Sequence, residues 1–138
     1  MGTNWIAFAL AVVTGIAIGA LWFGPRTFFP AWWKALGKTP DEQPGTANMG
    51  VVFGLTAIAV IVQAGVLSLL LPVIGTAVGS MGWFTGLATG ALLGLAFAAA
   101  PAITHKLFGG FRLWVWVLEA GQDIVSLAAM GAIIGAFS

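Results

Sequence analysis

The chain has 138 residues, of which 60% are hydrophobic and only 7% charged, with a formal net charge of +1. A soluble domain carries about 25% charged residues, so this composition excludes an ordinary water-facing surface and predicts a protein whose partner is the lipid bilayer. The small net charge excludes nucleic acid as an expected partner, and the lack of cysteine excludes disulfides and thiol chemistry.

Four long apolar runs predict four membrane-crossing helices, over about residues 5–23, 49–71, 82–103 and 113–137. Each run is close to or longer than the roughly 20 residues needed to cross a hydrocarbon core about 30 Å thick. Strands are not expected, because the runs do not alternate in polarity and open sheet edges cannot lie in lipid. The predicted fold class is therefore an all-α, integral membrane four-helix bundle, with one transmembrane domain over residues 1–138.

The first run is interpreted as a retained helix, because its first basic residue, Arg26, follows the apolar core instead of preceding it as in a signal peptide. Asn4 and Asn48 precede the first two runs and are expected to cap these helices. The connector over residues 24–47 mixes aromatic and basic side chains, which is typical of a short amphipathic segment in the headgroup region. These side chains are Phe28, Phe29, Trp32, Trp33, Arg26, Lys34 and Lys38.

Every fourth residue of the third run is a glycine, at Gly82, Gly86, Gly90 and Gly94. This glycine-zipper spacing makes one smooth helix face that another backbone can approach closely, so we expect these residues to pack against a helix. The neighbour could belong to the same chain or to a second subunit. Because four helices this short enclose little interior, we favour a homo-oligomer.

The fourth run carries four polar residues at helical spacing, Glu119, Gln122, Asp123 and Ser126, which would share one helix face. Counted from the start of the run, Glu119 lies about 9 Å deep and Asp123 about 15 Å, close to the bilayer centre. An ionised acid there costs on the order of 2.5–3.5 kcal/mol. The predicted runs contain no Lys, Arg or His to pair with these acids.

Two neighbouring acids without a basic partner cannot both stay ionised in a dry site, so one should hold a proton or bind a cation. This predicts a proton or cation pathway in which Asp123 is the principal residue. The alternative is a structural pair, hydrogen-bonded to Gln122, Ser126 or Gln63, with Glu119 extending towards Arg112 at the membrane surface.

Two further residues complete the candidate pathway. Gln63 lies inside the second run, where it could form an interhelical hydrogen bond or line the pathway. His105 follows the third run and is expected at the interface or at the inner end of a proton path. No metal-ligand spacing, phosphate-binding loop or Ser–His–acid set is present, so we expect no metal, no cofactor and no enzyme activity.

All five basic residues fall in the first and third connectors, and none in the second connector or the tails. The positive-inside rule therefore predicts that both termini are non-cytoplasmic. The expected location is the cell membrane, or the inner membrane if the source is bacterial. The basic residues are Arg26, Lys34, Lys38, Lys106 and Arg112.

Several motifs resemble one known family. They are Asn4-Trp5, GALWFGP at 19–25, Phe29, WWKALG at 32–37, AGQDIV at 120–125 and AMGAIIG at 129–135. The pattern resembles the bacterial membrane family catalogued as domain of unknown function 1761. The resemblance implies a four-helix membrane domain without assigned activity, cofactor or catalytic residue. That family more often has an aromatic residue and a histidine at the positions of Gln122 and Asp123, so this chain departs from the family pattern at its candidate ion-binding residue.

Two functional hypotheses follow. The first is a transporter or channel subunit that moves protons or a cation past Asp123 and Glu119. The second is a non-catalytic accessory or assembly subunit, whose glycine face docks onto a larger membrane complex or lipid.

Overall fold

The computed structural model describes residues 4–39, 41 and 48–138, and the part of the expected first connector over 40 and 42–47 lies outside it. Four helices are long and apolar enough to cross a membrane, and the described residues contain no strand. The predicted all-α membrane fold is confirmed, with a short helix between the first two spans. The elements are α1 (Trp5–Trp22), α2 (Phe29–Ala35), α3 (Met49–Val78), α4 (Trp83–Leu93), the π-helix η1 (Gly94–Ala99), α5 (Ala100–Phe108) and α6 (Leu113–Ala136).

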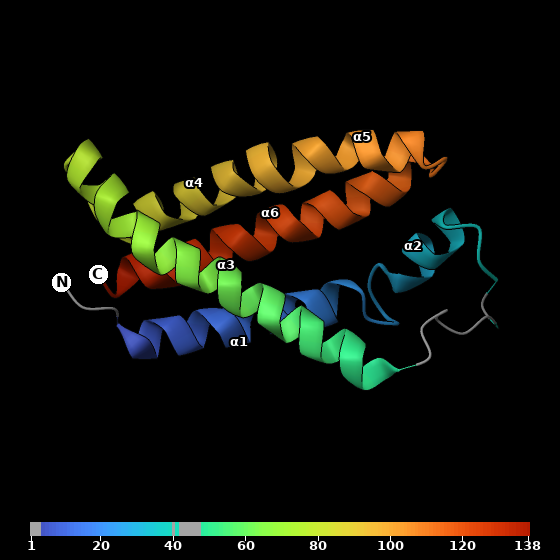
Figure 1. The fold of residues 1–138 in the computed structure, drawn as a ribbon, viewed down its shortest axis with the longest axis horizontal. Helices are drawn as coiled ribbons and strands as arrows, with labels where there is room; N and C mark the ends of the chain where they lie inside the picture. Colours follow the sequence, from blue (N-terminus) through green and yellow to red (C-terminus); the bar gives the residue numbers. More distant parts are fainter. Residues whose placement is uncertain (1–3, 40, 42–47) are drawn as a thin grey trace.

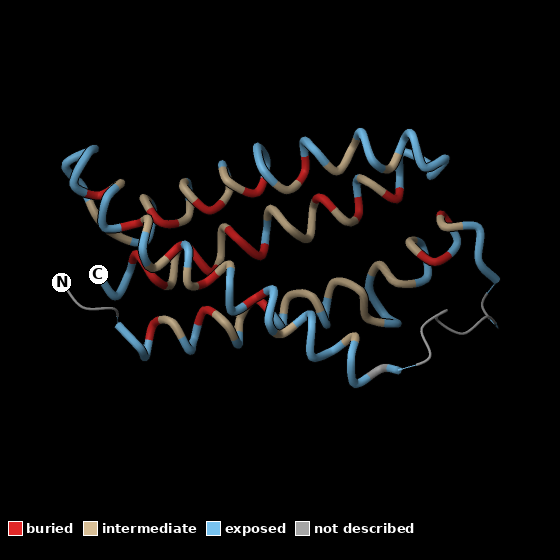
Figure 2. The backbone as a smooth tube through the Cα atoms, in the orientation of Figure 1, coloured by how far each residue is buried: buried red, intermediate tan, exposed pale blue. Residues whose placement is uncertain are grey.

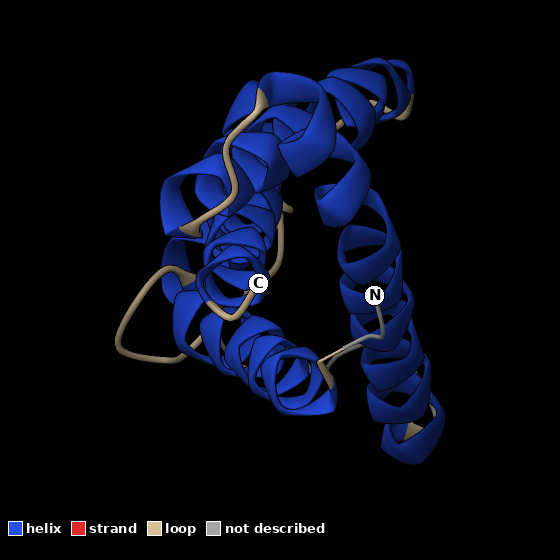
Figure 3. Ribbon diagram, turned by 90° about the vertical axis from the view of Figure 1, so that its left-hand side faces the viewer, coloured by secondary structure: helices blue, strands red, loops and turns tan. Residues whose placement is uncertain are grey.

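The helices have two distinct ends (Figure 1). The start of α1, the end of α6 and the α3–α4 connection lie at one end, which we call the termini end. The short helix α2 and the α5–α6 turn lie at the other, which we call the α2 end. Helix α6 is central, with α4 and α1 packed along it, and α3 crosses the bundle obliquely. Seen from the termini end in Figure 3, the described chain consists of helices joined by loops.

The predicted caps are present at the starts of the first two spans. The Asn4 side-chain oxygen accepts hydrogen bonds from the backbone N–H groups of Ile6 and Ala7, both at 3.1 Å. Asn48 accepts one from Val51 N–H at 3.2 Å. Each bond satisfies a donor that the first helical turn would otherwise leave unpaired.

Two helices are longer than the sequence pattern predicted. Helix α3 continues through Pro72 to Val78 and ends at Gly79, whose left-handed φ of 73° terminates it. The third span continues through Pro101 to Phe108, with η1 directly before that proline. Prolines are tolerated inside membrane helices because local π adjustments and neighbouring groups satisfy the freed backbone. The extension matters for the site, since it places Lys106 on a helix instead of in a loop.

The glycine face of the third span packs against α6 of the same chain. A Cβ added to Gly86 would overlap the Gly131 carbonyl, and one added to Gly90 would overlap the Leu127 carbonyl. A Cβ on Gly94 would lie 2.9 Å from Ile124 Cα. Figure 2 shows buried positions concentrated along α6.

Gly82 takes part differently from the other three glycines. A Cβ there would meet nothing within 4 Å, but the Gly82 carbonyl faces Gly135. The glycine series is therefore occupied within the chain. The homo-oligomer stays a prediction, and the glycine face does not support it because that face packs against α6 of the same chain.

The substitution Gly90→Ala tests this close packing. We expect it to lower the stability of the detergent-solubilised protein by about 1–3 kcal/mol, because the methyl group must displace the α6 backbone. Gly54→Ala is the matched control, since Gly54 lies on exposed α3 with open space around it. Alanine there should leave stability unchanged or raise it by up to about 1 kcal/mol. Equal effects in the two variants, measured by denaturant or thermal unfolding, would contradict the packing.

Candidate functional site

Three tryptophan side chains connect α6 with its neighbours around Glu119. The Trp22 indole N–H, at the end of α1, donates to the Leu118 carbonyl at 2.8 Å. The Trp32 indole N–H, from α2, donates to Glu119 Oε2 at 2.8 Å. The Trp116 indole N–H, from α6 itself, donates to the Ala99 carbonyl of η1 at 2.8 Å. An indole combines a large apolar surface with one donor, so each contact adds packing as well as a hydrogen bond.

Glu119 also forms an ion pair, with Lys106 from the last turn of α5. Lys106 Nζ lies 2.9 Å from Glu119 Oε1, and the two side chains are 25% and 26% exposed. The expectation that both acids lack a basic partner is therefore wrong for Glu119. The basic partner of Glu119 is Lys106 and not Arg112, towards which the sequence analysis expected Glu119 to extend. The physical reason is the extension of the third span to Phe108, which carries Lys106 alongside α6.

Aromatic rings fix the position of α2 beside this ion pair. The Trp22 and Phe28 ring centroids are 4.7 Å apart, and those of Phe23 and Trp32 are 5.0 Å apart. Trp33 is buried and donates its indole N–H to the Thr39 carbonyl at 2.8 Å. The aromatic segment thus packs onto the α2 end of the bundle, where it holds the Trp32 donor in place.

Asp123 lies one helical turn beyond Glu119 towards the termini end and is half-buried. Its backbone carbonyl lies under Gly94, where an added Cβ would be 3.4 Å away. Among the described residues, no hydrogen bond or ion pair involves the Asp123 side chain. Of the two acids expected to lack a basic partner, only Asp123 lacks one among the described residues.

The other two residues of the expected polar face contact different neighbours. The Gln122 amide nitrogen would lie 3.4 Å from a Cβ on Gly19, so Gln122 faces α1. Ser126 is buried, and its hydroxyl lies 3.7 Å from the Met130 sulfur within the core. The structure does not bring Ser126 into a hydrogen-bonded set with the acids.

The structure places neither Gln63 nor His105 in contact with the acids. Gln63 is half-buried on α3, and His105 is exposed on α5. Within the described ranges, neither side chain forms a hydrogen bond or ion pair. The same part of the chain contains no group of three or more His, Asp or Glu side chains that could hold a metal ion.

The motif residues Trp22 of α1 and Trp32 of α2 thus contact α6 at Leu118 and Glu119, directly before the motif at 120–125. A family comparison matches residues 6–135. The chain belongs to the DUF1761 family. The family is described as "protein of unknown function". No curated protein and no solved structure matches the chain.

Membership in the DUF1761 family confirms the resemblance, and the matched region includes every residue of the site. Sequence reasoning missed the roles of Trp22, Trp32 and Lys106. The signal for the two tryptophans was available, because both lie in the motifs that carried the resemblance. The signal for Lys106 was hidden by the assumption that the helix ends soon after Pro101.

A double-mutant cycle with Lys106→Met and Glu119→Gln tests the ion pair. We expect a coupling free energy of about 1 kcal/mol, because the pair is partly exposed and its attraction is screened by solvent. The matched control is a second cycle, which combines Arg112→Met with Glu119→Gln. That cycle should give about zero, since Arg112 is exposed at the start of α6. A larger coupling with Arg112 than with Lys106 would contradict the geometry.

Proposed function

We propose that this DUF1761 protein moves protons or small cations across the membrane, with Asp123 as the group that binds the ion. The observation that supports the proposal is the position of Asp123. It is half-buried in a membrane-spanning helix and has no basic partner among the described residues. A carboxylate in that position costs on the order of 2.5–3.5 kcal/mol unless a proton, a cation or water neutralises it.

The sequence analysis placed Glu119 beside Asp123 as a second ion-binding residue of the pathway, and this proposal gives it a different role. Its two carboxylate oxygens are engaged by Lys106 and Trp32, so it is not available as an ion-binding group in this conformation. We propose that this three-residue set closes the path at the α2 end. Opening would require the Lys106–Glu119 pair to separate.

The path is also closed on the other side of Asp123. Towards the termini end, α6 continues with Leu127, Met130 and Ile134, which all belong to the buried core cluster. Leu67 and Leu71 of α3 belong to the same cluster. The conformation therefore corresponds to an occluded state, and transport would require α3 to move relative to α6.

Proton and cation flux in proteoliposomes tests the proposal. We expect wild-type protein to dissipate an imposed proton or cation gradient, and Asp123→Asn to return the flux to that of protein-free vesicles. Asp41→Asn is the matched control, because Asp41 lies in an exposed turn outside the spans. Its flux should equal that of wild type.

Two results would contradict transport by Asp123. One is a flux that persists in Asp123→Asn, and the other is no flux in well-folded wild-type protein. If the second result came with stable co-purification of a larger membrane complex, it would favour the accessory-subunit hypothesis.

We further propose that both termini are non-cytoplasmic, on the basis of the basic residues at the α2 end. Because the chain has no cysteine, single cysteines report the orientation directly. In intact cells, an impermeant maleimide should label Ser138→Cys. It should label Asp41→Cys only after the membrane is permeabilised. The reverse pattern would invert the proposed orientation.

A further inference from the structure

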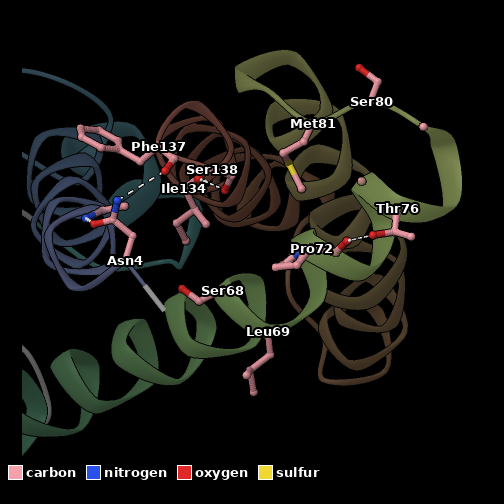
Figure 4. Close-up of a pocket in the computed structure, with 13 residues that line it drawn as sticks. Asn4, Ser68, Leu69, Pro72, Thr76, Ser80, Met81, Ile134, Phe137 and Ser138 are labelled. Atoms are coloured by element: carbon pink, nitrogen blue, oxygen red, sulfur yellow. Dashed lines mark hydrogen bonds between the residues drawn. The ribbon is translucent and has the colours of Figure 1, made fainter. Parts of the chain in front are cut away.

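A cavity of about 680 Å³ lies at the termini end, away from the acids (Figure 4). It is open on one side and is lined by the start of α1, the second half of α3, the α3–α4 connection and the end of α6. Its volume falls within the roughly 300–1,000 Å³ of typical small-molecule sites.

The walls of the cavity are apolar inside and polar at the rim. Ala7 and Ile134 form buried apolar wall, with 1% and 6% exposure. Thr76, Ser80 and Ser138 are exposed residues of the rim. Every lining side chain is uncharged, so no side chain of the cavity selects a carboxylate, a phosphate or a cation.

Pro72 changes the hydrogen bonding of the cavity wall. A proline has no backbone N–H, so the Ser68 carbonyl four residues earlier lacks its helical donor. The Ser68 hydroxyl likewise has no hydrogen-bond partner among the described residues. Figure 4 shows this hydroxyl on the side of α3 that faces Asn4 and Ile134.

Three neighbouring polar side chains already form hydrogen bonds within the protein, and the Ser80 carbonyl at the rim accepts from the Thr85 hydroxyl at 3.3 Å. The Thr76 hydroxyl donates to the Pro72 carbonyl at 2.9 Å, and the Ser138 hydroxyl donates to the Ile134 carbonyl at 2.7 Å. The Asn4 amide donates to the Phe137 carbonyl at 3.4 Å. Ser68 thus combines a carbonyl that lacks its helical donor with a hydroxyl that has no hydrogen-bond partner among the described residues.

We propose that this cavity binds the hydroxyl-bearing end of an uncharged lipid, of the monoacylglycerol type. The lipid hydroxyl donates to the Ser68 carbonyl, and the Ser68 hydroxyl donates to a lipid oxygen. The acyl chain leaves past Leu69, a lining residue that is 73% exposed on a membrane-spanning helix. The proposal depends on the cavity alone and is independent of ion transport by Asp123.

Native mass spectrometry of the detergent-solubilised protein with monooleoylglycerol tests the site. We expect one molecule to bind per chain. Ser68→Ala removes the hydroxyl, and Pro72→Ala restores a backbone donor to the Ser68 carbonyl. Each should weaken binding roughly 3- to 10-fold, the value of one hydrogen bond. Removing a proline from a helix interior favours the helix, so Pro72→Ala should fold at least as well as wild type.

Two comparisons make the result decisive. Thr56→Ala is the control, because it removes a hydroxyl from the exposed surface of α3 outside the cavity and should leave binding unchanged. Methyl oleate, which has the acyl chain but no hydroxyl, should bind more weakly than monooleoylglycerol. The proposal is overturned if the two lipids bind equally, if Ser68→Ala and Pro72→Ala retain full affinity, or if anionic phosphatidylglycerol displaces monooleoylglycerol from the site.

Discussion

The close approach of two backbones, α4–η1 and α6, is the constraint on which the rest of the structure depends. Carbonyl groups of Gly131 and Leu127 occupy the space that side chains would fill at Gly86 and Gly90. Lipid offers little hydrophobic drive for helix association, so such close packing must supply the attraction through van der Waals contact. It fixes α6 against the third span, and α1 and α3 then pack on the remaining faces of α6. The register of the same pair brings Lys106 beside Glu119.

The two acids of α6 show how one helical turn separates a structural role from a proposed functional one. Glu119 is close enough to the α2 end to receive an ammonium and an indole N–H, which satisfy one oxygen each. Asp123 is one turn deeper and bonds to neither group, and Gly94 brings the η1 backbone close to its carbonyl. An intramembrane acid that no basic group neutralises is the position where binding of a proton or cation lowers the free energy most.

The sequence predicted the features that lipid enforces and missed those that depend on neighbouring helices. Apolar length alone indicates four spans, because the bilayer leaves helices as the only form for these runs. The caps at Asn4 and Asn48 follow from local chemistry and were also predictable. The partner of Glu119 was not, because it required the helix to continue past Pro101. The glycine spacing predicted a contact face, but spacing carries no information on which backbone fills it.

Pro72 in α3 and Pro101 in α5 each remove one backbone N–H donor from a helix, and their surroundings differ. Around Pro101 the chain widens into η1, and the Trp116 indole donates to the Ala99 carbonyl, so the α2 half of the span has an additional donor from α6. Around Pro72 the Ser68 carbonyl has no helical N–H donor, and both residues line the cavity at the termini end. Leaving a backbone acceptor without a donor inside a membrane is costly. In the proposed complex a lipid hydroxyl supplies the missing donor, so the defect in α3 contributes one hydrogen bond to binding.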